Sequence, residues 1–199
     1  MGSPFRGARV ELTITPIPDE DESRAAALLL LSTTLGADYI TEQEIADLQA
    51  GKMHGMALGA FLDNELVGVL LGRMLEKETA AEYEAQAKEG GATAGLASQR
   101  LGLLQSVAVK PGCRGQGIGT GLSRALLDHL KRAGANAVLA VSWESGTRDS
   151  SAGMLEAVGF QRVARVAEFW KGDSLRRGYT CPRCGNPCRC AGVLYLRSM

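Results

Sequence analysis

The amino-acid sequence predicts one mixed α/β domain, and three observations carry that prediction. The chain has 199 residues, enough to bury the core of one domain without disulfide bonds. Short strand-like and helix-like patterns alternate along the chain, without an internal repeat. A glycine-rich turn near the middle follows a strand-like run and leads into a helix-like run. This order is typical of a sheet whose strands are linked by helical crossovers.

The expected elements follow from the period of the apolar residues and from the turn and capping residues between them. The patterns predict strands over 10–15, 56–62, 66–74, 101–109, 137–142, 161–170 and 192–197. They predict helices over 19–36, 41–50, 117–133 and 149–159. The polar Ala/Glu stretch 76–95 is expected to be a partly helical excursion with a flexible end at Gly90-Gly91.

In the first half, residues 10–15 alternate apolar and polar, which is typical of a half-buried strand. The acidic residues 19–22 favour a helix N-terminus, because its free N–H groups attract negative charge. Thr41 and Glu44 match a capping box, which predicts the start of the second helix. Asp63-Asn64 between the next two strands predicts a tight hairpin turn.

In the second half, 101–109 is an apolar run, which indicates a buried strand. The next helix carries one apolar face, formed by Ile118, Leu122, Leu126 and Leu130. After the strand 137–142, Asp149 or Ser150 is expected to cap a short helix. Two further strands complete the sheet.

The composition narrows the choice of function. Hydrophobic residues make up 45% of the chain and charged residues 22%, as in a soluble globular protein. The 22 basic residues balance 22 acidic ones, whereas a nucleic-acid-binding domain usually carries a basic excess. The longest apolar run, 25–31, is too short for a membrane span, and residues 1–20 lack the pattern of a secretory leader. We therefore expect a cytoplasmic protein without a membrane or nucleic-acid partner.

The glycine-rich turn over 112–121 has the features of a phosphate-binding site. The first N–H groups of a helix have no partner within the helix, and they carry partial positive charge. Glycines let the backbone approach an anion closely, because no Cβ stands in the way. Residues Arg114 to Thr120 are therefore a candidate cradle for a pyrophosphate.

Two known phosphate motifs fit this turn poorly. A P-loop ends in Gly-Lys-Ser/Thr, whereas this chain has Gly119-Thr120-Gly121 and no lysine there. A dinucleotide-binding turn follows its strand directly, with spacing Gly-x-Gly-x-x-Gly and an acidic residue about 20 positions on. Here residues 110–114 separate the strand from the glycines, although Glu144 would serve as the acidic residue. The second alternative is weakened but stays open.

A third motif fits closely. The segment Arg114-Gly115-Gln116-Gly117-Ile118-Gly119 resembles the Gln/Arg-x-x-Gly-x-Gly/Ala signature of the GNAT acetyltransferases. Residues 104–111 resemble that family's central strand, and 154–160 resemble its later helix, which ends in Gly-Phe. The resemblance implies a GNAT-type domain over 8–199. Its central sheet would be mixed but mostly antiparallel, with helices on its faces.

The resemblance also implies roles for individual residues. The pyrophosphate of acetyl-CoA would lie on the N–H groups of the candidate cradle, which comprises Arg114, Gly115, Gln116, Gly117, Ile118, Gly119 and Thr120. The pantetheine arm would lie along Val107, Ala108 and Val109 like an added strand. The N–H of Val107 would stabilise the oxyanion when an amine attacks the thioester. A base or a water chain must keep that amine neutral.

The sequence departs from the family pattern where a general acid is expected. The family often has a tyrosine at the position of Leu155, so the acid that protonates the leaving thiolate is unassigned. Polar residues near the expected cleft include Glu144 as a candidate base and Ser150 as a second catalytic candidate. Gln105 and Ser106 flank the expected strand splay and could orient a water molecule.

A cysteine cluster is the second strong signal. Cys181, Cys184, Cys188 and Cys190 lie within ten residues, and Cys-x-x-Cys-Gly is a turn that points two thiolates at one metal. Four thiolates suit a closed, structural zinc site. An iron–sulfur cluster, disulfides and free thiols remain alternatives. The cluster lies in a cysteine loop (residues 176–191) that is expected between the last two strands.

The most specific function that these patterns support is transfer of an acetyl group from acetyl-CoA to a primary amine. A protein N-terminus, a lysine and a small-molecule amine all fit as acceptors. Two alternatives belong to other classes: an acyl-CoA-binding sensor without turnover, and a binding module built on the cysteine cluster. A homodimer is compatible with the sequence.

Overall fold

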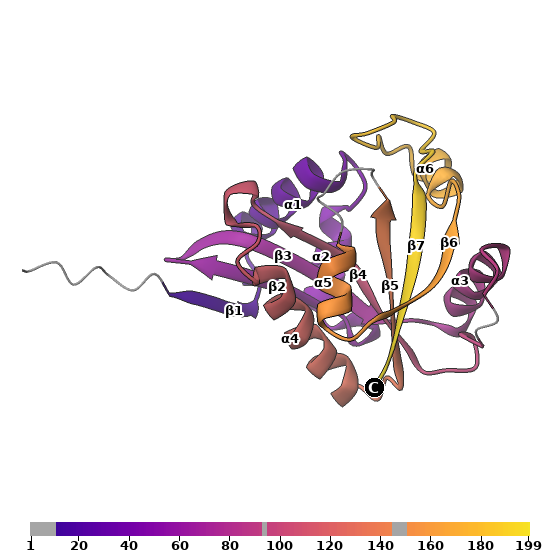
Figure 1. The fold of residues 1–199 in the computed structure, drawn as a ribbon. Coiled ribbons are helices and arrows are strands. Elements are labelled where there is room, and N and C mark those ends of the chain that lie inside the picture. The colour runs from indigo at the N-terminus through magenta and orange to yellow at the C-terminus, as the bar shows by residue number, and fades with distance from the viewer. Residues whose placement is uncertain (1–10, 93–94, 145–150) are drawn as a thin grey trace, which may run out of the picture.

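The computed structural model describes residues 11–92, 95–144 and 151–199. They form a mixed α/β fold around one seven-stranded sheet of order β1-β2-β3-β4-β5-β7-β6 (Figure 1). The strands are β1 (Leu12–Pro16), β2 (Met56–Leu62), β3 (Glu65–Met74), β4 (Leu101–Val109), β5 (Ala137–Glu144), β6 (Gln161–Val166) and β7 (Ala191–Ser198). Only the β4–β5 pair is parallel in this sheet, so the expectation of a mostly antiparallel sheet is confirmed.

Within the described ranges, six α-helices and two short 3-10 helices connect the strands. The α-helices are α1 (Asp21–Leu35), α2 (Glu42–Gln49), α3 (Lys77–Glu89), α4 (Ile118–Arg132), α5 (Ala152–Ala157) and α6 (Lys171–Arg177). The 3-10 helices are Lys52–His54 and Pro111–Cys113. None of the helices in the described part of the chain combines the length and apolar character that a membrane span requires.

The helices cover both faces of the sheet, because neighbouring strand residues point to opposite sides. On β3, Leu70 packs in the cluster that contains α4, whereas Val69 and Leu71 pack in the cluster that contains α1 and α2. The face predicted for α4 is buried, since Ile118 is 3% exposed and Leu122, Leu126 and Leu130 are fully enclosed. The helix α3 packs its buried alanines in a third cluster, against β6 and its neighbours.

Two local predictions are confirmed in atomic detail. Thr41 accepts a hydrogen bond from the Glu44 N–H at 3.2 Å, while Glu44 accepts one from the Thr41 N–H at 2.8 Å. These two bonds make the capping box of α2. Asp63 and Asn64 have φ of 48° and 68°, and this left-handed pair matches the hairpin turn that joins β2 to β3.

One element was predicted wrongly. The strand expected over 161–170 ends at Val166, and the helix α6 follows at Lys171. Aromatic Phe169 and Trp170 favour a strand locally, but Glu168 adopts φ of 50°, which turns the chain out of the extended conformation. A tertiary contact holds the turn, because the Phe169 N–H donates to the Cys190 carbonyl at 3.1 Å.

Candidate active site

The two parallel strands at the centre of the sheet separate toward their C-terminal ends. Pairing between β4 and β5 runs from Leu101 with Ala137 to Leu104 with Ala140 and stops there. Both strands continue, to Val109 and to Glu144 respectively. The fork between them leaves one edge of β4 without a neighbouring strand. An extended ligand could therefore add to this edge as a strand would.

The fork opens into a cavity of about 470 Å³. Its walls come from β4, β5, the start of α5, the α1–α2 connection and the segment between β6 and β7. On the sheet side it is lined by Leu104, Gln105, Ser106, Val107, Ala140, Val141 and Trp143. Arg114 lines it beside the glycine-rich turn, and its Nε donates to the Val109 carbonyl at 3.1 Å. The glycine-rich turn and the fork thus belong to one continuous site.

Aromatic rings form the opposite wall of the cavity. Tyr39 follows α1, whereas Trp170 and Tyr179 flank α6. The rings of Tyr39 and Tyr179 meet edge to face, with centroids 5.2 Å apart. Burial raises the pKa of both tyrosine hydroxyls, so both stay protonated at neutral pH. This wall therefore offers apolar surface together with hydroxyl groups.

The glycine-rich turn presents free backbone donors. Gly115 and Gly117 have φ of 74° and 80°. These two left-handed residues bend the backbone so that α4 can begin at the next residue, Ile118. Gly117 is the N-cap of α4 and provides no side-chain cap. The first intrahelical bond runs from the Gly121 N–H to the Gly117 carbonyl at 2.9 Å. The N–H groups of Ile118, Gly119 and Thr120 therefore have no helical acceptor.

The protein leaves space in front of these donors. Among the described residues, a Cβ built on Gly115 or Gly117 would meet no atom within 4 Å, and one on Gly119 would meet only Met154 Cγ at 3.5 Å. Core packing therefore does not explain the absence of side chains here. The side chain of Ile118 is buried in the core, so only its N–H faces the turn. Together these features make an anion site at a helix N-terminus.

The hydrogen-bond pattern of β4 indicates which N–H groups face the fork. The Lys110 N–H donates to the Val67 carbonyl at 2.8 Å, on the side of β3. Because N–H groups alternate between the two edges of a strand, those of Ala108 and Ser106 also point to β3. Those of Val109 and Val107 then point to the open edge. Val107 lines the cavity at this edge.

A β-bulge displaces Gln105 at the origin of the fork. Leu71 pairs with Ser106 and Gly72 pairs with Leu104, so Gln105 is the additional residue of β4. Its side-chain Oε1 is buried and has no hydrogen-bond partner among the described residues. A buried amide oxygen without a partner has a free-energy cost, and a ligand N–H or a water molecule would remove that cost. This oxygen is therefore a candidate acceptor inside the cavity.

The three positions considered for acid–base chemistry differ in what the structure shows. Leu155 lines the cavity and is only 1% exposed, so it contributes apolar surface there. Glu144 lies at the end of β5 and binds Arg165 through Nε at 2.8 Å and through Nη2 at 2.5 Å. This pairing lowers the pKa of Glu144, which makes the carboxylate a weaker base. Ser150 lies outside the described residues.

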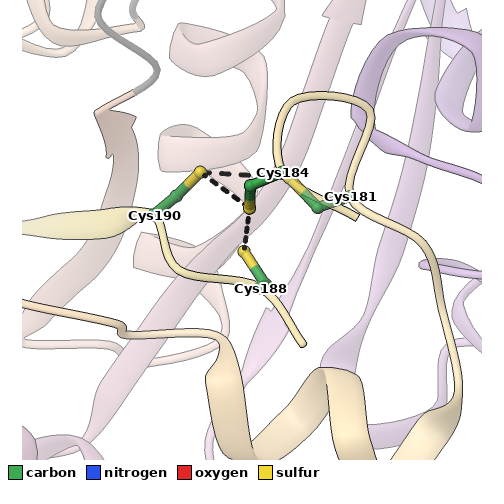
Figure 2. Close-up of side chains that lie close together, drawn as sticks. All are labelled: Cys181, Cys184, Cys188 and Cys190. Atoms are coloured by element: carbon green, nitrogen blue, oxygen red, sulfur yellow. Dashed lines mark hydrogen bonds between the residues drawn. The ribbon is translucent and has the colours of Figure 1, made fainter. Parts of the chain in front are cut away.

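The four clustered cysteines converge on one point (Figure 2). Their sulfur atoms all lie within 4.8 Å of one another. The Sγ separations are 3.9 Å for Cys181–Cys190, 3.8 Å for Cys184–Cys188 and 3.6 Å for Cys184–Cys190. In tetrahedral zinc with Zn–S bonds of about 2.3 Å, the sulfur atoms lie about 3.8 Å apart. The separations fit a zinc tetrathiolate and exceed the S–S bond length of a disulfide, about 2.0 Å.

Backbone donors and neighbouring side chains hold the cysteine loop. The Arg189 N–H donates to Cys184 Sγ at 3.1 Å, and the Cys188 N–H donates to Ser174 Oγ at 2.9 Å. The Asn186 amide group donates to the carbonyls of Ser174 and Tyr179 at 2.9 and 3.0 Å. N–H donors to thiolate sulfur are typical of metal-bound cysteines. The loop is therefore built around the position where the sulfur atoms meet.

Several cavity residues have no signal in the sequence. Tyr39, Trp143, Trp170 and Tyr179 are far apart along the chain and belong to no motif. They come together because the α1–α2 connection and the β6–β7 segment pack against each other beside β5, which carries Trp143. By contrast, Gln105 and Ser106 were recognised from their place next to the expected fork.

Comparisons with known proteins agree with this geometry. The sequence model described as the Acetyltransferase (GNAT) family matches residues 25–160, which is more than half of the chain. No sequence among the curated proteins matches significantly.

Similar solved structures cover nearly the whole chain. The NatC complex bound to Gag peptide and CoA aligns with TM-score 0.64 and 14% identity over 95% of this chain and 99% of that chain. The ribosomal-protein-S18-alanine N-acetyltransferase from Escherichia coli aligns with TM-score 0.60 and 14% identity over 94% of each chain. Drosophila melanogaster polyamine N acetyltransferase aligns with TM-score 0.63 and 11% identity over 95% and 100%. At these identities the likeness shows a shared fold.

Proposed function

The chain belongs to the GNAT acetyltransferase family, and from that premise we propose that it transfers an acetyl group from acetyl-CoA to a primary amine. The observation that carries this proposal is the continuity of the site. The free N–H groups at the start of α4, the open edge of β4 and the cavity at the fork follow one another. A long ligand with an anionic end and a reactive thioester end suits this arrangement.

The anionic end belongs on the glycine-rich turn. The pyrophosphate would accept hydrogen bonds from the backbone of Gly115, Gln116, Gly117, Ile118, Gly119 and Thr120, whereas the Arg114 N–H already donates to the Pro111 carbonyl at 3.3 Å. Charge-assisted bonds of this kind are stronger than bonds between neutral groups. The space beside Gly115 and Gly117 supports this placement, because a Cβ there would meet no atom of the described residues within 4 Å.

The thioester end belongs at the fork. The pantetheine arm would bond to the open edge of β4 along Val107, Ala108 and Val109. The Val107 N–H would then donate to the thioester oxygen and stabilise the oxyanion. The amine nitrogen attacks the carbonyl carbon, a C–N bond forms, the C–S bond breaks and CoA leaves as the thiolate. The amine proton must pass to a base or to water.

The proton acceptor is the least constrained part of the proposal. Gln105 Oε1 would align the amine or a water molecule, because it is buried at the fork without a partner. Glu144 stays a candidate base, but its ion pair with Arg165 disfavours that role. Ser150 stays the second candidate from the sequence. The wall opposite the fork, with Tyr39 and Tyr179, is the side from which an acceptor amine would approach.

We further propose that Cys181, Cys184, Cys188 and Cys190 hold one structural Zn²⁺. The sulfur separations fit a tetrahedral site, and four protein ligands leave no position open for substrate. The metal would fix the loop conformation and would not take part in acetyl transfer. Metal analysis of the purified protein tests this directly. One zinc per chain is expected, whereas a brown protein with iron would indicate an iron–sulfur cluster instead.

Calorimetric titration with acetyl-CoA tests the cradle, with 3′-dephospho-CoA and NAD as controls. Binding of acetyl-CoA and not of NAD is expected, and absence of acetyl-CoA binding would refute the proposed site. Release of free thiol with a panel of primary amines then tests turnover. Binding without thiol release for any amine would favour a non-catalytic acyl-CoA sensor, an alternative to which Leu155 at the usual tyrosine position points.

A further inference from the structure

The cysteine loop forms part of the cavity wall. Tyr179, Cys181, Pro182, Arg183 and Cys188 all line the cavity. Figure 1 shows this segment next to α6, at the end of the sheet where β5 terminates. We propose that metal binding by the four cysteines fixes the conformation of the acceptor wall, which is the side of the cavity with Tyr39, Trp170 and Tyr179. The conformation of the glycine-rich turn, where CoA would bind, does not depend on the metal. This inference rests on the proposed function and on the proposed zinc.

The loop is joined to the α1–α2 connection, which forms another part of the same cavity wall. The Thr180 N–H donates to the Ala37 carbonyl at 3.3 Å, and the ring of Tyr179 packs on Tyr39. A Cβ on Gly36 would lie 2.6 Å from the Thr180 carbonyl oxygen, so the two segments are in close contact. A change in the loop must therefore move the α1–α2 side of the wall or break these contacts.

Short connections run from the sulfur atoms to the wall. Tyr179 is two residues from Cys181, and its carbonyl accepts a hydrogen bond from Asn186, which lies between the two middle cysteines. On the sheet side, Trp143 of β5 pairs with Gly192 of β7, which is two residues from Cys190. A metal that fixes the four sulfur atoms would thus fix both Tyr179 and Trp143. The loop offers no other core, since most of its residues are exposed.

The CoA-binding turn is held by other interactions. Residues 114–120 continue into α4, whose buried leucines pack against β2 and β3. None of the cluster cysteines belongs to this core. Loss of the metal should therefore alter one end of the site and spare the other.

The chain carries a built-in reporter for this prediction. Its two tryptophans, Trp143 and Trp170, both line the cavity. Intrinsic tryptophan fluorescence therefore reports on the cavity wall, and it needs no knowledge of the acceptor. The experiment compares full-length protein as purified, after chelation, and after titration with Zn²⁺ alone. Zinc content, acrylamide quenching and calorimetric affinity for acetyl-CoA are measured on each sample.

Chelation is expected to remove one zinc per chain, shift the tryptophan emission to the red and increase quenching by acrylamide. Zinc should reverse these changes, and acetyl-CoA affinity should stay within about two-fold throughout. C184S should mimic the chelated state, because Cys184 is exposed and its sulfur does not line the cavity. The control is R176A in the same loop, because the Arg176 side chain is 76% exposed and does not line the cavity.

Three outcomes would overturn the inference, and they are distinguishable. Absence of bound zinc in the purified and the zinc-titrated protein would refute the metal itself. Zinc binding with unchanged emission and quenching would show that the metal does not shape the wall. A loss of acetyl-CoA affinity on chelation that accompanies the fluorescence change would show that the glycine-rich turn also depends on the metal. Absence of acetyl-CoA binding even with zinc present would instead refute the proposed function. Far-ultraviolet circular dichroism excludes global unfolding as the cause of a fluorescence change.

Discussion

The two ends of the site are built in different ways. The turn before α4 is made of consecutive residues, and its donors are backbone N–H groups whose direction follows from two left-handed glycines. The cysteine loop comes from a different part of the chain and contributes side chains, four of which meet at one point. The turn is held by α4 and its packing against β2 and β3, whereas the cysteine loop needs contacts with the α1–α2 connection, α6 and β5. Changes at the turn should therefore act on coenzyme binding alone, and changes at the loop on the acceptor wall.

The largest effect is expected at the turn itself. In G119V the added side chain would occupy the space in front of the free N–H groups. Loss of two charge-assisted hydrogen bonds to the pyrophosphate should weaken acetyl-CoA binding by about 100-fold or more, measured by calorimetry. Gly119 has no positive φ, so the substitution causes no backbone strain.

The matched control is G172V in α6, where a Cβ meets no atom of the described residues within 4 Å, whereas at Gly119 it makes only an ordinary contact with Met154 Cγ at 3.5 Å. It should retain acetyl-CoA affinity, with a similar small loss of helix stability. Equal loss of affinity in both variants would remove the assignment of the turn as the coenzyme site.

The second effect concerns the loop. Chelation of zinc should accelerate trypsin cleavage after Arg176, Arg177, Arg183 and Arg189 by about ten-fold or more, because cleavage follows local opening of the backbone. Mass spectrometry of the fragments identifies the sites. Cleavage after Arg114, next to the glycine-rich turn, should keep its original rate. If cleavage at both ends accelerated together, the comparison between them would fail.

A smaller effect is expected at the bulge in β4. In Q105M a buried oxygen without a partner is replaced by an apolar group of similar length, so the melting temperature should stay equal or rise. The turnover number measured by thiol release should fall about five-fold, which is the rate factor that corresponds to the free energy of one neutral hydrogen bond. Unchanged turnover would show that Gln105 has no role in aligning the amine or water.

The smallest effect is expected at Glu144. Its pKa is lowered by Arg165, so the carboxylate is charged at neutral pH and the ion pair is lost only when the pH falls through that lowered pKa. Stability from this pair is therefore present above the ordinary glutamate pKa and disappears in acid. In E144Q we expect thiol release within about two-fold of the original rate at neutral pH.

A general base at this position would give a different result. Its removal should lower kcat/KM by about 10²–10⁴-fold, and the pH–rate profile should lose an ionisation. Such a loss in E144Q, without the same loss in R165Q, would restore Glu144 as the base. A loss in both variants would indicate that the ion pair itself positions the end of β5.

Much of the fold could be predicted because its signals are local. The four apolar residues of α4, the capping box of Thr41 and Glu44, and the left-handed turn at Asp63-Asn64 each depend on neighbours within a few positions. The strand that was expected to extend to Trp170 shows the limit of such signals. Phe169 and Trp170 have the composition of a strand, but the hydrogen bond from Phe169 to Cys190 belongs to a contact distant in sequence.

The sequence by itself determined the segments that use backbone chemistry or closely spaced ligands. A glycine-rich helix N-terminus and four cysteines within ten residues require no knowledge of the rest of the chain. Only the tertiary structure decided that β4 and β5 separate after Leu104 and that the cysteine loop lines the cavity at the fork between these strands. It also decided that Tyr39 packs against Tyr179. The reason is physical: side chains far apart in the chain are brought together by packing of whole elements, which no local pattern encodes.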